Sequence, residues 1–358
     1  MSAKIHDAII DQTQRGTFIV LEAGPTHDGI ASAKQLALAA KEAGADAVKF
    51  QLLSADRLMA DKSIQFSYQY LEIDETGAER FVPIEEPLYD ILKRRELKAE
   101  EWRSLKAYCD EIGIVMFTTA TYRDEVDFIV DDLAIGSIKI NSGDVNDLEF
   151  IAYCASKGVN IQLDTGNADI WEIERAVIVA EEAGCHNIVI HLCPSGYPTK
   201  EESIHLRMLN TLKMMFPHYA IAFSDHSPGW DMDIAAVALG ADMIEKTITL
   251  DRTTKSCEHS FSLEPADAKR LVESIRKVEK ALGQTRRTIP TAVKASRKKA
   301  RRSPYAMRAL AIGETIKRED FEFKRPGFGI TSEEFDYFVG KVVAKPIYEG
   351  GIITYDHI

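Results

Sequence analysis

Residues 42–50 read EAGADAVKF and residues 238–246 read ALGADMIEK, two similar stretches that lie far apart in the chain. In each, a helical stretch ends at a glycine (Gly44 or Gly240), and a short apolar run containing a lysine follows. Glycine after the last turn of a helix supplies the left-handed backbone conformation that lets the chain turn into the next strand. A repeated helix-to-strand junction of this kind is typical of a chain built from βα units.

Eight short apolar runs of strand type alternate with helical stretches between residues 17 and 283. Each run is nearly continuous in apolar residues rather than alternating, which indicates parallel strands buried on both faces. Eight βα units that close into a barrel are the simplest arrangement, so the sequence predicts an α/β fold, a (β/α)8 TIM barrel. The eight runs are residues 18–24, 46–51, 114–119, 137–143, 160–166, 187–193, 220–226 and 242–249.

Two regions interrupt this alternation. Residues 54–98 are too long for an ordinary connection and are rich in aromatic residues, so we expect a lid or rim over a site. Residues 284–304 are polar and strongly basic, and we expect them to be a solvated hinge rather than a nucleic-acid contact. The predicted domains are therefore the barrel at 1–283, a linker at 284–304 and a small β-rich domain at 305–358.

The composition is that of an ordinary globular protein and excludes disordered or collagen-like chains, with 45% apolar and 28% charged residues. The net charge of −12 argues against general nucleic-acid binding but permits an anionic small substrate in a locally basic cleft. No apolar run is long enough to span a membrane, and residues 1–16 lack the apolar core of a signal peptide. The five cysteines include no CxxC pair. We expect a cytoplasmic protein with reduced cysteines and no membrane partner.

Polar and charged residues stand at the carboxyl ends of the predicted strands, where barrel enzymes place their active sites. Lysines inside apolar strands are costly unless they are paired or used. Lys49 and Lys139 could form a phosphate cradle with the hydroxyls of Ser142 and Ser224, which is the interpretation we favour. Alternatively, the two lysines are interior residues paired with the carboxylates of Glu22 and Glu245.

Other strand-end residues have structural alternatives as well. His226 could be a metal ligand or a hydrogen-bonded structural histidine. Asp225 and Glu245 could be functional, helix caps or salt-bridge partners. Ser195 and Tyr197 lie in a PSGYPT segment that could be a simple turn.

Several ordered motifs resemble the sialic acid (N-acetylneuraminate) synthase family. They are FIVLEAGPTHDG, AAKEAGADAVKFQ, IKINSGDVNDL, SGYPT, AFSDHSPGWDMDIAAVALGAD, IEK followed by TLDR, FKRPGFGI and GKVVAKPIYEGG. The resemblance covers nearly the whole chain and includes a carboxyl-terminal antifreeze-like (SAF) domain. It implies condensation of phosphoenolpyruvate with an N-acetylmannosamine-like aldose to give a nine-carbon 3-deoxy-2-keto acid and phosphate.

The resemblance also implies roles for individual residues. Lys49, Lys139, Ser142 and Ser224 match the phosphoenolpyruvate contacts, and Ser195 falls where the family has asparagine or serine. Glu22, Gln51 and Tyr197 resemble sugar-binding positions, and Glu22 or Glu258 could move protons. Arg325 resembles an arginine that the small domain of one subunit extends into the barrel of its partner, which predicts a domain-swapped homodimer. His226 matches one of two histidines that hold a divalent metal. The predicted catalytic residues are Glu22, His226, Glu245 and Glu258.

The chain departs from the family pattern at several of these places. Thr247 stands where the second metal histidine is expected, and Glu258 replaces a sugar-contacting aspartate. Thr26 replaces an asparagine, and Asp164 enters a phosphate-binding turn. With one histidine, oxygen ligands would dominate, so Mn²⁺ or Mg²⁺ is the expected cofactor, with His259 as a substitute ligand.

Two rival functions remain open at the level of sequence. One is a barrel aldolase in which Lys139 or Lys246 forms a Schiff base. The other is a non-catalytic protein that binds a sugar phosphate.

Overall fold

The computed structural model describes residues 16–358, which form two compact units, residues 16–283 and 284–358. Residues 1–15 lie outside the described residues, so the prediction that the amino terminus carries no signal peptide is not tested by the structure. No helix of the described chain is both long and apolar enough to cross a membrane.

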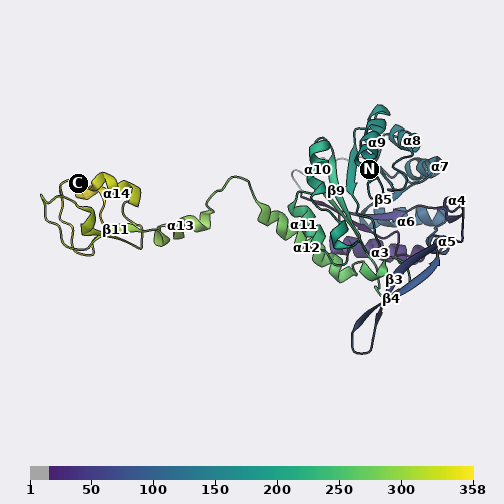
Figure 1. The fold of residues 1–358 in the computed structure, drawn as a ribbon, viewed down its shortest axis with the longest axis horizontal. Coiled ribbons are helices and arrows are strands. Elements are labelled where there is room, and N and C mark those ends of the chain that lie inside the picture. The colour runs from purple at the N-terminus through teal and green to yellow at the C-terminus, as the bar shows by residue number, and fades with distance from the viewer. Residues whose placement is uncertain (1–15) are drawn as a thin grey trace. The chain divides into compact units, whose positions relative to one another are not determined.

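The first unit is a closed barrel of eight parallel strands, as the sequence predicts (Figure 1). Around the barrel the order is β1-β2-β5-β6-β7-β8-β9-β10, and β10 pairs with β1 to close it. Each strand falls within one of the eight predicted runs. The strands are β1 (Phe18–Glu22), β2 (Ala47–Gln51), β5 (Val115–Thr119), β6 (Ser137–Ile140), β7 (Asn160–Asp164), β8 (Ile188–Leu192), β9 (Ala220–Asp225) and β10 (Met243–Thr247).

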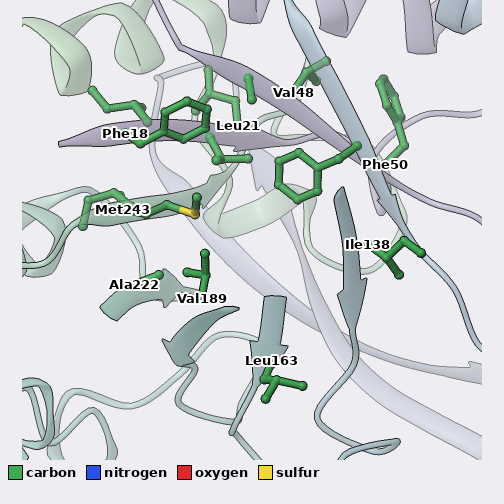
Figure 2. Close-up of a cluster of buried hydrophobic side chains, with 14 of the residues drawn as sticks. Phe18, Leu21, Val48, Phe50, Ile138, Leu163, Val189, Ala222 and Met243 are labelled. Atoms are coloured by element: carbon green, nitrogen blue, oxygen red, sulfur yellow. The ribbon is translucent and has the colours of Figure 1, made fainter. Parts of the chain in front are cut away.

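Helices cover the outside of the barrel (Figure 1). Their apolar faces pack on the outward-pointing strand residues, and Figure 2 shows part of the resulting core, including Leu21, Val48 and Ile138. Gly44 and Gly113 take the left-handed conformation after their helices, as the junction motif requires. The covering helices are α3 (Ile30–Ala43), α6 (Ala99–Ile112), α7 (Arg123–Asp127), the π-helix η1 (Phe128–Asp132), α8 (Leu148–Ser156), α9 (Ile170–Glu182), α10 (Met208–Met215), α11 (Asp231–Ala238) and α12 (Pro265–Leu282).

The long insertion after β2 forms its own substructure. An antiparallel hairpin of β3 (Gln65–Ile73) and β4 (Glu79–Pro87) lies between the short helices α4 (Ala55–Leu58) and α5 (Leu88–Lys93). Tyr68 and Ile91 of this insertion pack with Cys257 in a separate small apolar cluster. The insertion is thereby attached to the chain that follows β10, beside the carboxyl ends of the strands.

The second unit contains α13 (Thr291–Ala300), β11 (Ser303–Ala306), β12 (Phe321–Lys324) and α14 (Ser332–Phe338). β11 and β12 form a two-stranded antiparallel sheet. Phe321, Phe335 and Phe338 lie in a small core of its own. The segment predicted as a linker, 284–304, contains α13 and the first residues of β11.

Candidate active site

A cavity of about 260 Å³ lies at the carboxyl ends of the barrel strands. The strands bring polar side chains to it, and the segment from residue 52 to residue 95 contributes most of its apolar lining. Eight of the residues predicted for the site line this cavity: Glu22, Lys49, Gln51, Ser142, Tyr197, His226, Glu245 and Glu258.

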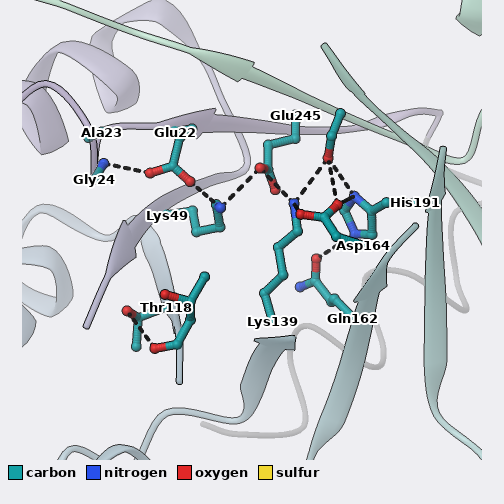
Figure 3. Close-up of polar contacts among 12 residues, drawn as sticks. Glu22, Ala23, Gly24, Lys49, Thr118, Lys139, Gln162, Asp164, His191 and Glu245 are labelled. Atoms are coloured by element: carbon teal, nitrogen blue, oxygen red, sulfur yellow. Dashed lines mark hydrogen bonds and ion pairs between the residues drawn. The ribbon is translucent and has the colours of Figure 1, made fainter. Parts of the chain in front are cut away.

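A buried cluster of ion pairs forms the floor of the site (Figure 3). Lys49 Nζ contacts a carboxylate oxygen of Glu22 and lies 3.1 Å from Glu245 Oε1. Lys139 Nζ lies 2.8 Å from that same Glu245 oxygen and 3.0 Å from Asp164 Oδ2. The alternative of interior lysines paired with Glu22 and Glu245 is therefore the arrangement present here, and the phosphate cradle stays a prediction about the bound state.

Burial and the neighbouring charges move the pKa values of this cluster in different directions. Burial lowers the pKa of Lys49, although Glu245 opposes the shift. Burial also acts to lower the pKa of Lys139, but Asp164 and Glu245 outweigh it, so the net shift is upward. The pKa of Glu245 is lowered because the two lysines outweigh its desolvation. Lys139 and Glu245 are therefore a charged pair at neutral pH.

A chain of hydrogen bonds through the barrel interior holds Lys139 on the side away from the cavity (Figure 3). Lys139 Nζ donates to Ser224 Oγ at 3.0 Å, and Ser224 Oγ lies 2.9 Å from His191 Nδ1. His191 Nε2 lies 2.9 Å from Gln162 Oε1. The amide nitrogen of Gln162 in turn donates to Ser137 Oγ. Because Gln162 Oε1 can only accept, His191 carries its proton on Nε2 and accepts from Ser224. Burial lowers the pKa of His191 to about 3, which keeps it neutral.

Four predicted residues lie outside the cavity lining. Lys139 and Ser224 are buried beneath it. Ser195 is exposed and donates to the Gly166 carbonyl at 2.9 Å, and it is linked through Asn167 to Ser142. Arg325 is an exposed residue of the second unit, directly after β12.

Gly24 allows the end of β1 to approach β2 closely. Its backbone N–H donates to Glu22 Oε1 at 2.5 Å. A Cβ atom at this position would lie 2.5 Å from the same oxygen and 2.7 Å from the backbone nitrogen of Gln51. Only glycine fits there, so the EAG segment orients the Glu22 carboxylate toward Lys49.

The residues expected to hold a metal do not form a metal site in the described chain. Within residues 16–358, no group of three or more His, Cys, Asp or Glu side chains is arranged to bind a metal ion. His226 lies against the ring of Tyr197, with ring centroids 4.8 Å apart. His259 instead lies 2.7 Å from Thr249 Oγ1 through its Nδ1 and lines a neighbouring cavity. The structure therefore does not place His259 as a substitute ligand beside His226.

The lysine of the IEK motif also lies away from the cavity. Lys246 is completely buried, and its Nζ donates to Asp225 Oδ2 and to the Ser227 carbonyl, each at 2.5 Å. Asp233 of α11 lies 3.6 Å away, on the outer side of the barrel. These contacts give Asp225 the salt-bridge role that the sequence left open.

Sequence reasoning missed several residues that line the cavity. Arg95 is the clearest case, because it is only 6% exposed and comes from the charged run KRRE, which has the composition of a solvent-facing helix end. Asn141 directly follows β6 and could have been found by the strand-end criterion. Phe66 belongs to the aromatic insertion that the sequence predicts as a lid or rim, whereas Leu88 and Leu92 of the apolar lining carry no sequence signal of their own.

Comparison with known proteins identifies the family of the chain. The NeuB family model matches residues 36–287, and the SAF domain model matches residues 301–358. The chain belongs to the NeuB family. It is 31% identical to the N,N'-diacetyllegionaminic acid synthase of Legionella pneumophila, over 95% of this chain and 94% of that protein. It is 32% identical to the human N-acetylneuraminate-9-phosphate synthase, over 95% of this chain and 92% of that protein.

A solved structure supports the same relationship. The N-acetylneuraminic acid (sialic acid) synthetase of Leptospira borgpetersenii, crystallised with citrate, superposes with a TM-score of 0.67 at 26% identity, covering 78% of this chain and 90% of that one. The predicted family, the TIM-barrel fold followed by an SAF domain, and the assignment of this NeuB member as a synthase-type enzyme are confirmed.

Proposed function

We propose that this NeuB-family protein condenses phosphoenolpyruvate with an N-acetylmannosamine-like aldose to form a nonulosonic, sialic-acid-type 3-deoxy-2-keto acid and phosphate. The observation that supports this most is the buried cluster of Lys49, Lys139 and Glu245 at the base of a cavity that also carries Glu22 and Glu258. Cations that can exchange carboxylate partners for an anionic substrate are suited to a carboxylate and a phosphate ester.

The reaction forms one carbon–carbon bond and breaks one carbon–oxygen bond. C3 of phosphoenolpyruvate attacks the aldehyde carbon of the open-chain sugar, and the aldehyde oxygen takes up a proton to become a hydroxyl. Water adds at C2 and loses a proton, and the tetrahedral intermediate expels phosphate to leave the 2-keto acid. Water therefore gives up both of its protons: one balances the proton taken up by the aldehyde oxygen, and the other leaves with phosphate when the C2 hydroxyl becomes the keto oxygen.

The residues of the cavity divide between these tasks. In this proposal Lys49 and Lys139, with Ser142 and Ser224, bind the anionic groups of phosphoenolpyruvate. Gln51 and Tyr197 position the sugar. Glu22 and Glu258 are the carboxylates available in the cavity for proton transfer, and Glu22 is oriented by the backbone N–H of Gly24.

Dependence on Mn²⁺ or Mg²⁺ remains a prediction. His226 is the single histidine among the described residues that line the cavity, and the position expected to supply the second histidine is Thr247. Because these residues do not form a metal site by themselves, no step of the proposed reaction is assigned to a metal. The cytoplasmic location and the shared-site homodimer also remain predictions.

The Schiff-base alternative is disfavoured by the location of Lys246 and by the charged state of Lys139. Lys246 is buried outside the cavity in ion pairs. Lys139 is kept charged by Asp164 and Glu245, which raise its pKa. A Schiff-base lysine must reach the substrate carbonyl as a free amine. Treatment with borohydride in the presence of substrate should therefore trap no covalent adduct, whereas a trapped adduct at either lysine would support the aldolase.

The direct test is phosphate release from phosphoenolpyruvate in the presence of a panel of aldoses. N-acetylmannosamine, a diacetamido sugar and an unmodified hexose should be compared, each with and without added Mn²⁺. Aldose-dependent release of phosphate supports the synthase. Binding of the aldoses without any phosphate release would instead support the non-catalytic sugar-phosphate-binding protein.

A further inference from the structure

Arg95 is a buried cation at the cavity that the proposed reaction does not use. It follows α5 in the insertion, is 6% exposed, and lines the candidate active-site cavity. Its guanidinium donates one long hydrogen bond, 3.3 Å from Nη2 to the carbonyl of Cys257. Among residues 16–358, no carboxylate lies within ion-pair distance of it.

This isolation contrasts with the neighbouring basic residues. Arg94 donates to both carboxylate oxygens of Glu86, and Lys93 pairs with Glu96. Lys49 and Lys139 pair with Glu245. A guanidinium carries five N–H donors, and burying it without an anion is costly. The position of Arg95 is therefore that of a cation whose counter-ion is not part of the described chain.

The surroundings of Arg95 extend beyond the active-site cavity. Arg95 also lines a second cavity of about 260 Å³ that contains His27, Thr249 and His259. His27 is 4% exposed, and neither of its ring nitrogens has a hydrogen-bond partner. Burial and the nearby Arg95 charge lower its pKa to about 4, so the imidazole is neutral and can donate one hydrogen bond and accept another. Arg95, which has no carboxylate partner, and His27, which has no hydrogen-bond partner, thus line the same second cavity.

We infer that Arg95 binds an anionic group of the aldose, a carboxylate or a phosphate ester. This inference rests on the proposed function. The anionic groups of phosphoenolpyruvate are assigned to Lys49 and Lys139 at the strand ends, whereas Arg95 comes from the insertion. Its hydrogen-bond partner, the carbonyl of Cys257, directly precedes Glu258, the position that resembles a sugar contact. Planar, bidentate recognition of carboxylate and phosphate is what guanidinium favours.

The test compares three aldoses in the phosphate-release assay with the full-length protein: N-acetylmannosamine, its 6-phosphate and N-acetylmannosaminuronate. We expect kcat/KM to be at least about tenfold higher for one of the two anionic sugars than for the neutral sugar. The 6-phosphate and the uronate distinguish a phosphate ester from a carboxylate. In Arg95→Gln this preference should be lost while the KM for phosphoenolpyruvate stays unchanged, and Arg95→Lys should retain part of it.

Arg94→Gln is the matched control, because Arg94 is ion-paired with Glu86 and does not line the active-site cavity. It should keep the preference of the unmodified protein. Preference for the neutral sugar, or an equal loss for all three sugars in Arg95→Gln, would overturn the inference. A raised KM for phosphoenolpyruvate in Arg95→Gln would assign Arg95 to that substrate instead.

A binding measurement separates this inference from the proposed function. Calorimetric titration of the 6-phosphate and the uronate without phosphoenolpyruvate should show binding that Arg95→Gln weakens about tenfold and Arg94→Gln does not. If this holds while no aldose promotes phosphate release, the synthase proposal fails and the anion site stands. If phosphate is released but neither anionic sugar binds through Arg95, the anion site fails and the synthase stands.

Discussion

Glu245 Oε1 lies 2.8 Å from Lys139 Nζ and also 3.1 Å from Lys49 Nζ, so a single buried carboxylate oxygen links the two lysines. The lysines come from β6 and β2, which are not neighbours in the barrel, and Glu245 from β10 bridges them across its interior. An anionic substrate that binds both lysines must compete with this carboxylate. The two lysines are thus held close together without substrate, with Lys49 lining the cavity and Lys139 buried beneath it.

Loss of either lysine should weaken binding of phosphoenolpyruvate. We expect Lys49→Met and Lys139→Met each to raise the KM for phosphoenolpyruvate at least about tenfold, because each removes a charge-assisted contact of about 1.5–3 kcal/mol. Steady-state kinetics at saturating aldose measures this. Lys139→Met also leaves Asp164 beside Glu245 without its cation, so its thermal unfolding should be checked first. An unchanged KM in both variants would exclude the assignment.

Stability should fall as the pH is lowered below about 6.5, because three buried histidines must stay neutral in the folded protein. Burial lowers the pKa of His27 and His259 to about 4 and that of His191 to about 3. Between these values and the ordinary pKa of 6.5, the unfolded chain binds more protons than the folded one, so protonation favours unfolding. In this pH range each histidine lowers the free energy of unfolding by up to about 1.4 kcal/mol for each pH unit of acidification.

Urea unfolding at pH 7.5, 6.0 and 5.0 measures this dependence. His27→Leu should reduce the pH dependence of the free energy of unfolding by the contribution of one histidine. The substitution breaks no side-chain hydrogen bond, because neither ring nitrogen of His27 has a partner. His218→Leu is the control, because His218 is exposed. Equal slopes for His27→Leu and the unmodified protein would contradict the prediction.

Metal dependence should be weak and easily abolished by a chelator, because Thr247 replaces a nitrogen ligand. Activity should fall on treatment with EDTA and return with Mn²⁺ or Mg²⁺. His226→Ala should abolish the response to metal, whereas His259→Ala should not, since His259 lines the neighbouring cavity beside Thr249. Activity that is indifferent to the chelator would count against any metal requirement.

The active site should be shared between two subunits of a homodimer. Arg325→Ala and Lys49→Met chains, each impaired alone when phosphoenolpyruvate is limiting, should regain part of the activity after subunit exchange. If Arg325 acts on the partner's barrel, a mixed dimer contains one site with both residues intact. If it acts on its own barrel, every site lacks one residue. The absence of recovery after exchange has been demonstrated by mass spectrometry would refute the shared site.

The sequence by itself determined the barrel, because buried parallel strands and helix-ending glycines are encoded locally. The continuous apolar runs at 18–24 and 187–193 are typical of strands buried on both faces, and Gly44 marks a helix-to-strand junction. The strand-end criterion also placed Glu22, Lys49 and Glu245 in one site, since parallel strands bring their carboxyl ends to the same face.

Only the tertiary structure decided which charges meet. Whether Lys139 faces a substrate or Asp164 and Glu245 depends on distances across the barrel interior, which no local pattern contains. The opposite environments of Lys246 and Glu245, adjacent in sequence, follow from the alternation of side chains along β10. Arg95 is the extreme case, because its burial depends on how the insertion packs beside residue 257, far away in the chain.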